Sequence, residues 1–370
     1  MAKRGTCLLL AVAAVLLVLV ALSLPVLLSG NAGGIGGLLR RGLTRVTLLS
    51  RSDELARAIG SDSTPVRFEV QHGDSAASVA QQLHGAGLIL DEQLFVDYAF
   101  ANGLDVQLRA GVYFLNQAQT IPAIAQQLAD AFGGALRLRI FPGWRVEQVA
   151  AAIDNHRRLE FGGAEFLQLV GPNSWLDPAQ AALTGLPPGA SLEGYLFPDD
   201  YNLPPNLTAL GLRQALIQQL LARVTPQMLT DAAAQGFTLH EVLTLASIVE
   251  RESLREDEDP RIAGVYRRRL AIGMKLEADP TVQYGLAPQG GNWWPQITQA
   301  HYRSVDSPWN TYLHGGLPPG PIASPGLSAI HAAIYPAESD SLFFRAACDG
   351  SGYHNFARSF EEHLANACPS

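Results

Sequence analysis

An acidic side chain at the end of a strongly patterned helix is the most suggestive chemical feature of the sequence. Residues 238–241 read Thr-Leu-His-Glu, a capping box in which the threonine hydroxyl and the glutamate carboxylate satisfy free amides at a helix start. Leu239, Leu243, Ala246 and Glu250 then follow at spacings of four, three and four residues. These spacings place them on one helical face, so Glu250 continues an apolar stripe.

Burial against that stripe would suit Glu250 to proton transfer. A carboxylate among apolar side chains loses hydration, so its pKa is expected to rise toward the range that a general acid needs. Glu252 points to another face of the same helix. The competing interpretation is that Glu250 lies at a frayed helix end and pairs with Arg251 or Arg255. The pattern alone leaves both possibilities open.

Two further clusters combine chemistry-bearing residues. The segment 192–201 interleaves Glu193 and Asp199 with Tyr195 and Tyr201, a composition suited to binding sugar rings, although a loop with one buried tyrosine fits equally well. The second cluster joins residues 307–312 to a run rich in proline and glycine at 316–326. Such a run predicts a rigid loop whose backbone groups can line a cleft at low entropic cost.

Composition excludes several classes of function. The 26 basic residues are outnumbered by 34 acidic ones and are scattered, which argues against a nucleic-acid partner. None of the nine histidines shows the close spacing of zinc ligands, so no metal is expected. Cys348 and Cys368 could form a disulfide or remain free thiols, and the sequence decides neither.

The first residues predict a membrane anchor. Residues 7–28 carry no charge, and about 20 apolar residues span a bilayer, whereas the apolar part of a signal peptide is shorter. We therefore expect a cytoplasmic tail at 1–6, a single transmembrane anchor at 7–29 and a linker at 30–65. Everything after the anchor is expected outside the cytoplasm, at the cell membrane. A cleaved signal peptide remains the alternative.

The remaining chain predicts an α+β fold in two parts. A small αβ module at 66–134 comprises strands at 66–70 and 111–115 and three helices, whose starts are marked by Asp74 or Ser75, by Asp91 and by Thr120. A larger α+β domain at 135–370 begins with a strand at 136–141. Its further helices are expected at 214–224, 238–252, 260–271 and 328–333, and a strand at 341–346.

These motifs resemble a known family. The run Leu-Ala-Ser-Ile-Val-Glu-Arg-Glu at 245–252 is very similar to the catalytic helix of the endolytic murein transglycosylases, often called YceG-like. Similar segments of the family stand in the same order at 192–201, 261–285, 307–326 and 352–356, and the module at 66–134 looks like the family's LysM-like subdomain. Two departures are Trp309, where a tyrosine is more usual, and an elaborated loop at 288–295.

The resemblance implies a lytic transglycosylase that needs no cofactor. Glu250 would protonate the bond between N-acetylmuramic acid and N-acetylglucosamine, and then accept the proton of the muramyl 6-hydroxyl as a 1,6-anhydro ring closes. Such an enzyme would terminate glycan elongation, with peptidoglycan strands, the membrane and cell-wall synthesis enzymes as partners. The residues expected to bind substrate are Glu193, Tyr195, Asp199, Tyr201, Asp279, Asn310, Tyr312, Pro318 and His354.

Two other functions remain open at this point. A hydrolytic muramidase would use Glu193 or Asp279 as a second carboxylate and would consume water. A non-catalytic membrane anchor would bind peptidoglycan through the small module, and Glu250 would then be structural.

Overall fold

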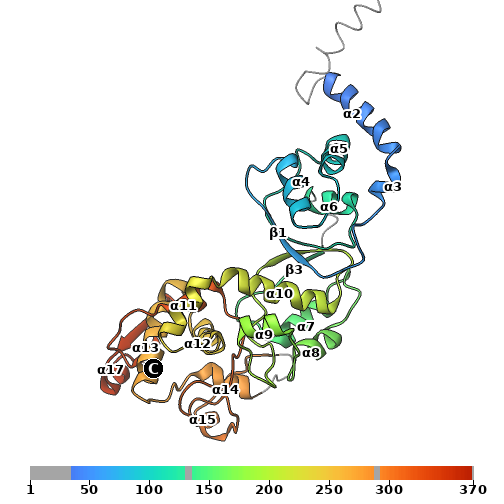
Figure 1. Ribbon diagram of the computed structural model, residues 1–370. Coiled ribbons are helices and arrows are strands. Elements are labelled where there is room, and N and C mark those ends of the chain that lie inside the picture. Colours follow the sequence, from blue (N-terminus) through green and yellow to red (C-terminus); the bar gives the residue numbers. More distant parts are fainter. Residues whose placement is uncertain (1–34, 130–135, 287–291, 369–370) are drawn as a thin grey trace, which may run out of the picture. The chain divides into compact units, whose positions relative to one another are not determined.

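The structure, a computed structural model, describes residues 35–129, 136–286 and 292–368 of the chain. The predicted anchor at 7–29 lies outside these residues, and no helix within them is long and apolar enough to cross a membrane. The described residues form many helices and a few short strands joined by loops, which confirms the predicted α+β class. The chain divides into two compact units, with residues 64–67 and those from Leu136 onward forming the larger one (Figure 1).

The smaller unit follows the expected order of elements. Ser75 caps α4 by accepting a hydrogen bond from the Ser78 amide, and Asp91 caps α5 in the same way through the Leu94 amide. Residues such as Leu83 fill the unit's core. Its elements are α2 (Ile35–Leu49), α3 (Ser52–Leu55), β1 (Val66–Val70, with only residues 68–70 in this unit), α4 (Ala76–Gly85), α5 (Glu92–Asn102), β2 (Gly111–Leu115) and α6 (Ile121–Ala129).

Two helices, α2 and α3, occupy the segment that the sequence suggested was a linker. Helix α2 is held in place by contacts with residues far away in sequence. The Arg41 guanidinium lies 5.3 Å from the ring centroid of Phe100, and Arg45 donates a hydrogen bond of 2.9 Å to the carbonyl of Ala101. Both partners belong to α5, so packing against α5 stabilises α2. The glycine-rich start of the segment gave no sign of this helix.

The larger unit contains the residues of the predicted active site. Its strands pair antiparallel, β3 with β4 and β5 with β6. The elements are β3 (Leu136–Arg139), α7 (Val146–Asp154), α8 (Gly163–Val170), α9 (Pro178–Thr184), β4 (Asp200–Leu203), α10 (Ala209–Arg223), α11 (Pro226–Ala234), α12 (Leu239–Glu252), η1 (Glu256–Glu258), α13 (Asp259–Ala271), α14 (Asp279–Gly285), α15 (His301–Ser304), α16 (Leu327–Ile334), β5 (Phe343–Ala346), β6 (His354–Ala357) and α17 (Phe360–Ala365).

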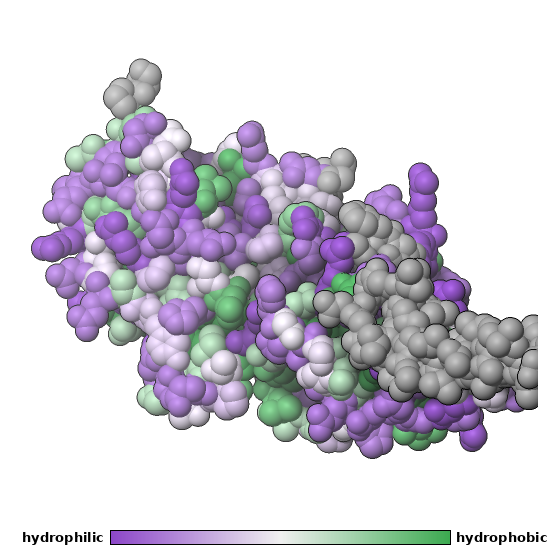
Figure 2. All heavy atoms as spheres, turned by 90° about the horizontal axis from the view of Figure 1, so that it is seen from above, coloured by the Kyte–Doolittle hydropathy of each residue, from purple (hydrophilic) through white to green (hydrophobic). Residues whose placement is uncertain are grey.

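Helix α12 runs through the core of this unit. Its residues 242–249 are all buried, and it packs against α13 and α16. The predicted capping box is confirmed, because Thr238 accepts a hydrogen bond from the Glu241 amide while the Glu241 side chain accepts one from the Thr238 amide. Side chains on the molecular face drawn in Figure 2 are mostly hydrophilic, as expected for a surface in contact with water.

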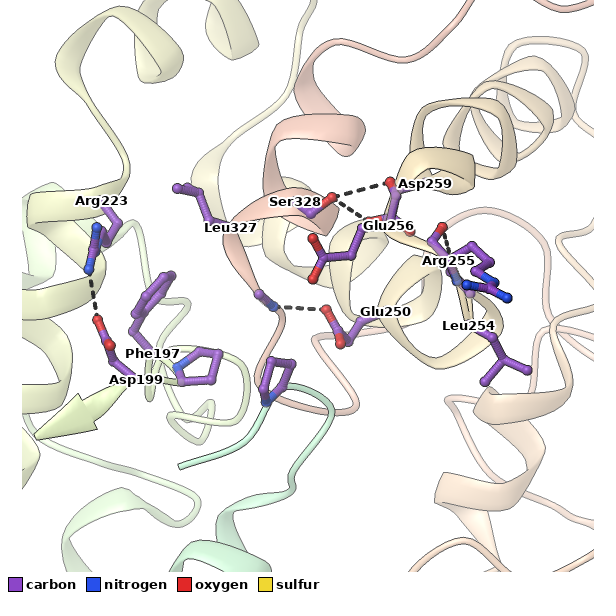
Figure 3. Close-up of a pocket in the computed structure, with 14 residues that line it drawn as sticks. Phe197, Asp199, Arg223, Glu250, Leu254, Arg255, Glu256, Asp259, Leu327 and Ser328 are labelled. Atoms are coloured by element: carbon purple, nitrogen blue, oxygen red, sulfur yellow. Dashed lines mark hydrogen bonds and ion pairs between the residues drawn. The ribbon is translucent and has the colours of Figure 1, made fainter. Parts of the chain in front are cut away.

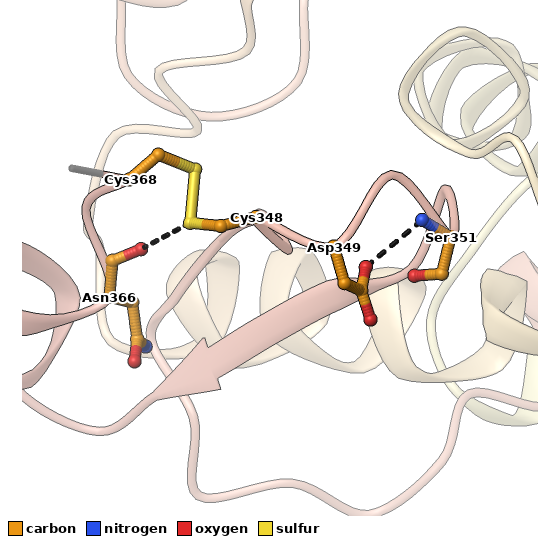
Figure 4. Close-up of a disulfide and its surroundings, with 5 residues drawn as sticks. All are labelled: Cys348, Asp349, Ser351, Asn366 and Cys368. Carbon is orange, nitrogen blue, oxygen red and sulfur yellow. Dashed lines mark hydrogen bonds between the residues drawn. A yellow bond between two sulfur atoms is a disulfide. The ribbon is translucent and has the colours of Figure 1, made fainter. Parts of the chain in front are cut away.

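The end of the described chain is fastened by a disulfide between Cys348 and Cys368, which settles the question that the sequence left open (Figure 4). The two cysteines are 20 positions apart in sequence, and the loop that their bond closes contains β6 and α17. Helix α17 has only six residues, too few to be stable alone. The rings of Phe360 and His363 pack on Phe343 of β5, with centroids 5.9 and 5.4 Å away.

Replacement of both cysteines by serine is expected to loosen this segment first. Closing a loop of this length contributes roughly 3 kcal/mol through the unfolded state. The Cys348→Ser/Cys368→Ser variant should therefore melt at a lower temperature and be cut by protease within residues 347–368 before the rest. A reducing agent should lower the wild-type melting temperature and leave the variant unchanged. Equal melting temperatures in oxidised wild type and variant would contradict a stabilising role.

Candidate active site

Glu250 lies in the last turns of α12, where that helix meets the start of α16. Its Oε2 atom accepts a hydrogen bond of 2.9 Å from the backbone amide of Gly326, the residue that caps α16 (Figure 3). Amides at a helix start have no partner within the helix, so they favour a carboxylate. A side chain at position 326 would crowd this contact, because its Cβ would stand 3.2 Å from the same oxygen.

The environment of Glu250 raises its pKa to about 6. Burial is the main cause, since it penalises the charged form, and the negative charge of Asp259 acts in the same direction. The Gly326 amide and the nearby Arg251 oppose the shift. The result is a carboxyl group that holds or releases a proton close to neutral pH.

A pocket of about 450 Å³ opens beside this carboxyl group. Across it from Glu250 lies an ion pair in which Arg223 donates to Asp199 at 2.9 Å, next to the ring of Phe197 (Figure 3). On the side of Glu250, the Ser328 hydroxyl donates a hydrogen bond of 2.7 Å to Asp259. The pocket thus presents fixed polar groups and an aromatic ring around one protonatable carboxyl.

Arg251 does not neutralise its neighbour Glu250. Instead the guanidinium carbon of Arg251 lies 4.1 Å from the ring centroid of Trp294, and that of Arg145 lies 4.5 Å from the same centroid. No ion pair of Glu250 with Arg251 or Arg255 occurs among the described residues. Trp294 belongs to the described end of the loop that the sequence marked as elaborated, and its ring holds Arg251 by a cation–π contact.

Four of the nine predicted substrate-binding residues line one or the other of two pockets. Asp199 shares the pocket of Glu250. Asp279, Tyr312 and His354 instead line a second pocket of about 390 Å³, together with Glu252 on another face of α12. Glu193, Tyr195, Tyr201, Asn310 and Pro318 line neither of these two pockets, and a contact of theirs with substrate remains a prediction.

The two buried tyrosines of the 192–201 cluster form hydrogen bonds within the protein. Tyr201 donates a hydrogen bond of 2.6 Å to the carbonyl of Phe197, which holds the backbone at Phe197. The Tyr195 hydroxyl bonds to Nδ1 of His240 at 2.9 Å, while Nε2 of His240 bonds to the Pro319 carbonyl. Because a carbonyl only accepts, Nε2 carries the proton and Nδ1 accepts from the tyrosine.

Glu193 is also buried, with 2% of its surface exposed, and its Oε1 atom has no hydrogen-bond partner. Burial raises the pKa of Glu193 to about 8, with the charge of Glu147 acting in the same direction. A neutral carboxyl group near neutral pH follows, and this lowers the cost of its burial.

Asn310 acts on the second pocket through the backbone. Its Nδ2 donates to the carbonyls of Val305 at 2.9 Å and Tyr302 at 3.2 Å, while its Oδ1 accepts from the Tyr312 amide at 3.0 Å. The rings of Tyr302 and Tyr312 stack with centroids 4.0 Å apart. The buried Asn310 therefore fixes the loop that carries these two tyrosines. Pro318 is buried in the following rigid run.

Sequence reasoning singled out neither Arg223 nor Asp259 in the pocket of Glu250, and it included Gly326 only as the end of the run 316–326, whose backbone groups can line a cleft. Arg223 lies at the end of α10, Asp259 begins α13, and the Gly326 amide starts α16. Asp259 carried a usable signal, because an acid followed by proline is typical of a helix start. Nothing in the linear pattern indicated that these three helix ends meet at Glu250.

The arrangement can transfer one proton to and from a ligand in the pocket. Among the described residues, no three histidine, cysteine or acidic side chains come together as a group that could hold a metal ion. The carboxyl of Glu250 has the pKa and the burial that suit a general acid or base.

Comparison with known proteins places the chain in a family. Residues 68–368 match the YceG-like family. The endolytic murein transglycosylase of Bacillus subtilis is 29% identical over 325 residues, which cover 84% of this chain and 86% of that protein. The endolytic murein transglycosylase of Streptococcus pneumoniae serotype 2 is also 29% identical, over 81% of this chain and 57% of its own length.

A solved structure agrees with these sequence matches. The crystal structure of a YceG-like protein from Listeria monocytogenes superposes with a TM-score of 0.53 and 27% sequence identity. The match covers 82% of this chain and 99% of the Listeria chain. Together with the match over residues 68–368, it shows that the chain belongs to the YceG-like family.

Proposed function

We propose that this protein is an endolytic lytic transglycosylase that cuts peptidoglycan glycan strands, with Glu250 as acid and base. The observation that carries the proposal is the partly buried carboxyl of Glu250, whose pKa of about 6 lets it donate and reclaim a proton near neutral pH. Membership of the YceG-like family supports it, as do the relatives that are named endolytic murein transglycosylases.

The proposed reaction needs one carboxyl group rather than two. Glu250 protonates the glycosidic oxygen between N-acetylmuramic acid and N-acetylglucosamine, and the bond to the muramyl carbon breaks. The same carboxylate then takes the proton of the muramyl 6-hydroxyl as that oxygen closes a 1,6-anhydro ring. Attack by a hydroxyl of the same sugar is intramolecular, which lowers the entropic barrier. The products keep all atoms of the substrate, and no water is consumed.

Hydrolysis is disfavoured, because neither residue that the sequence suggested as a second catalytic carboxylate lines the pocket of Glu250. A second carboxylate would have to flank the same glycosidic bond as Glu250. Glu193 does not line the pocket of Glu250, and Asp279 lines the second pocket. Asp199, which does line the pocket of Glu250, is held in an ion pair with Arg223. We therefore favour the anhydro-forming reaction.

The cellular setting is part of the same proposal. A single anchor at 7–29 would hold the catalytic unit outside the cytoplasm, close to newly made strands at the membrane surface. The smaller unit would serve as a LysM-like glycan-binding module. Cutting strands there would end their elongation, and cell-wall synthesis enzymes would be the partners of the protein.

Glu250→Gln is expected to abolish cleavage of purified murein. The amide cannot donate a proton as an acid does, so the rate should fall by at least about a hundredfold. Mass spectrometry of wild-type products should show 1,6-anhydro ends. Glu338→Gln is the control, since it removes an exposed carboxyl that lines neither pocket and should leave the activity unchanged. Reducing ends in place of anhydro ends would indicate hydrolysis, and full activity of Glu250→Gln would refute the assignment.

Asp259→Asn is expected to move the pH dependence of cleavage. Glu250 must be protonated to act as the acid, so the rate should fall as the pH rises through about 6. The charge of Asp259 raises the pKa of Glu250, and its removal should shift this fall to lower pH, by less than about one unit. Asparagine can still accept the hydrogen bond from Ser328.

The measurement is a profile of kcat/KM against pH on a soluble glycan fragment. Asp257→Asn provides the control, because the Asp257 carboxylate is exposed and accepts a hydrogen bond from Tyr353 at 2.9 Å. Its profile should match that of wild type. A shift of the Asp259→Asn profile to higher pH would show that the electrostatic explanation is wrong.

A further inference from the structure

The second pocket has chemistry that proton transfer at Glu250 does not use. It lies on the face of α12 that carries Glu252, and its walls come from α13, α14, β5 and α17. Its volume of about 390 Å³ is enough for a small organic group. Both this pocket and that of Glu250 belong to the larger unit, and the last turns of α12 contribute a carboxyl group to each.

Most charged groups in this lining already have partners. The carboxyl of Glu252 accepts a hydrogen bond of 2.8 Å from Tyr266, and burial raises its pKa to about 7. Glu277 pairs with Arg269 at 3.3 Å. His354 pairs with Glu258 at 2.9 Å, and that pair is almost fully buried. These groups are therefore satisfied within the protein.

Two lining charges have no ionic partner within the described residues. Arg345 forms no ion pair there, and its Nη1 atom is buried without a hydrogen-bond partner. Asp279 accepts hydrogen bonds from Tyr312 at 2.7 Å and Tyr302 at 3.4 Å, but it forms no ion pair with any described residue. An unpaired guanidinium favours a carboxylate, and an unpaired carboxylate favours an ammonium group. The lining thus complements a ligand that carries both charges.

Aromatic rings also line this pocket. Phe343 and Phe360 pack with centroids 5.9 Å apart, and Phe344 meets Tyr266 edge-on at 5.6 Å. Such walls suit short aliphatic groups between the two charged ends of a ligand. Helix α17 supplies Phe360 and His363 to this wall, and the disulfide at Cys348 fastens the chain behind it. The wall is therefore held in place before a ligand arrives, which favours binding.

We infer that this pocket binds a short peptide bearing a free carboxylate and a free amine, with Arg345 for the carboxylate and Asp279 for the amine. The inference rests on the proposed function, because peptidoglycan strands carry short peptides with both groups. A peptide held here beside the glycan pocket would let the enzyme distinguish strands that carry intact peptides from bare glycan.

Binding by the full-length protein in detergent tests this assignment. Calorimetry on the Glu250→Gln protein, which prevents turnover, would compare two probes: a disaccharide tetrapeptide from murein and the same disaccharide without its peptide. The peptide should improve affinity. Adding Arg345→Gln should reduce affinity for the peptide-bearing probe about tenfold or more, as expected for a lost charge-assisted bond. The ratio of the two affinities should fall toward one, and Asp279→Asn should lower it too.

Arg358→Gln is the matched control. Arg358 is an exposed arginine close in sequence, 3.9 Å from the exposed carboxylate of Asp340 and outside the pocket lining. This variant should keep the wild-type ratio. Arg345→Lys keeps the charge without the planar fork, so its ratio should be intermediate, and melting temperatures would show that each variant is folded.

Equal affinity of the two probes for the unaltered pocket would overturn the inference, and so would equal ratios for Arg345→Gln and Arg358→Gln. Failure of the proposed function looks different. In that case Glu250→Gln would still cut murein, whatever the binding ratios.

Discussion

The hydrogen bond between Glu250 and the Gly326 amide joins the two helices on which the active site depends. It links the end of α12 to the start of α16, the pair of helices with the most extensive packing in the larger unit. The buried stripe of α12 fixes where the carboxyl group stands, and the free amide of α16 gives its charged form one partner. Burial is the larger influence, so the pKa rises to about 6 rather than falling. A carboxyl with one such partner can ionise without being trapped as an anion.

The rest of the site is arranged so that this balance is kept. Arg251, the nearest cation along the chain, makes a cation–π contact with the ring of Trp294 and forms no ion pair with Glu250. Across the pocket, Asp199 and Arg223 neutralise each other. If either cation paired directly with Glu250, the carboxylate would be favoured and the acid form lost near neutral pH. The separation of these charges is therefore as important to the proposed chemistry as the presence of Glu250.

Buried polar residues fix the loops that line the two pockets. Asn310 bonds to three backbone groups around Tyr302 and Tyr312, and Tyr201 holds the backbone of Phe197. The sequence grouped these residues with those expected to bind substrate, and the structure shows them bonded to the backbone of residues that line the two pockets. Their burial with satisfied hydrogen bonds explains why the loops are well defined despite little regular structure.

Local signals in the sequence were enough to predict many of the helices and several of the residues at which they begin. The capping box at Thr238, the caps at Ser75 and Asp91 and the apolar stripe ending at Glu250 all depend on residues within a few positions, and the structure has each of them. The raised pKa of Glu250 followed from the same stripe. The helix α2 was not foreseen, because its stability comes from contacts with α5.

Only the tertiary structure decided which helix ends meet. Arg223, Asp259 and Gly326 lie on three separate elements, and Asp279 was assigned with Asp199 although the two line different pockets. The sequence also left Cys348 and Cys368 undecided, whereas the folded chain joins them. Helix periodicity specifies one face of one element, but the meeting of distant elements depends on how all the buried faces pack together, and that information is not local.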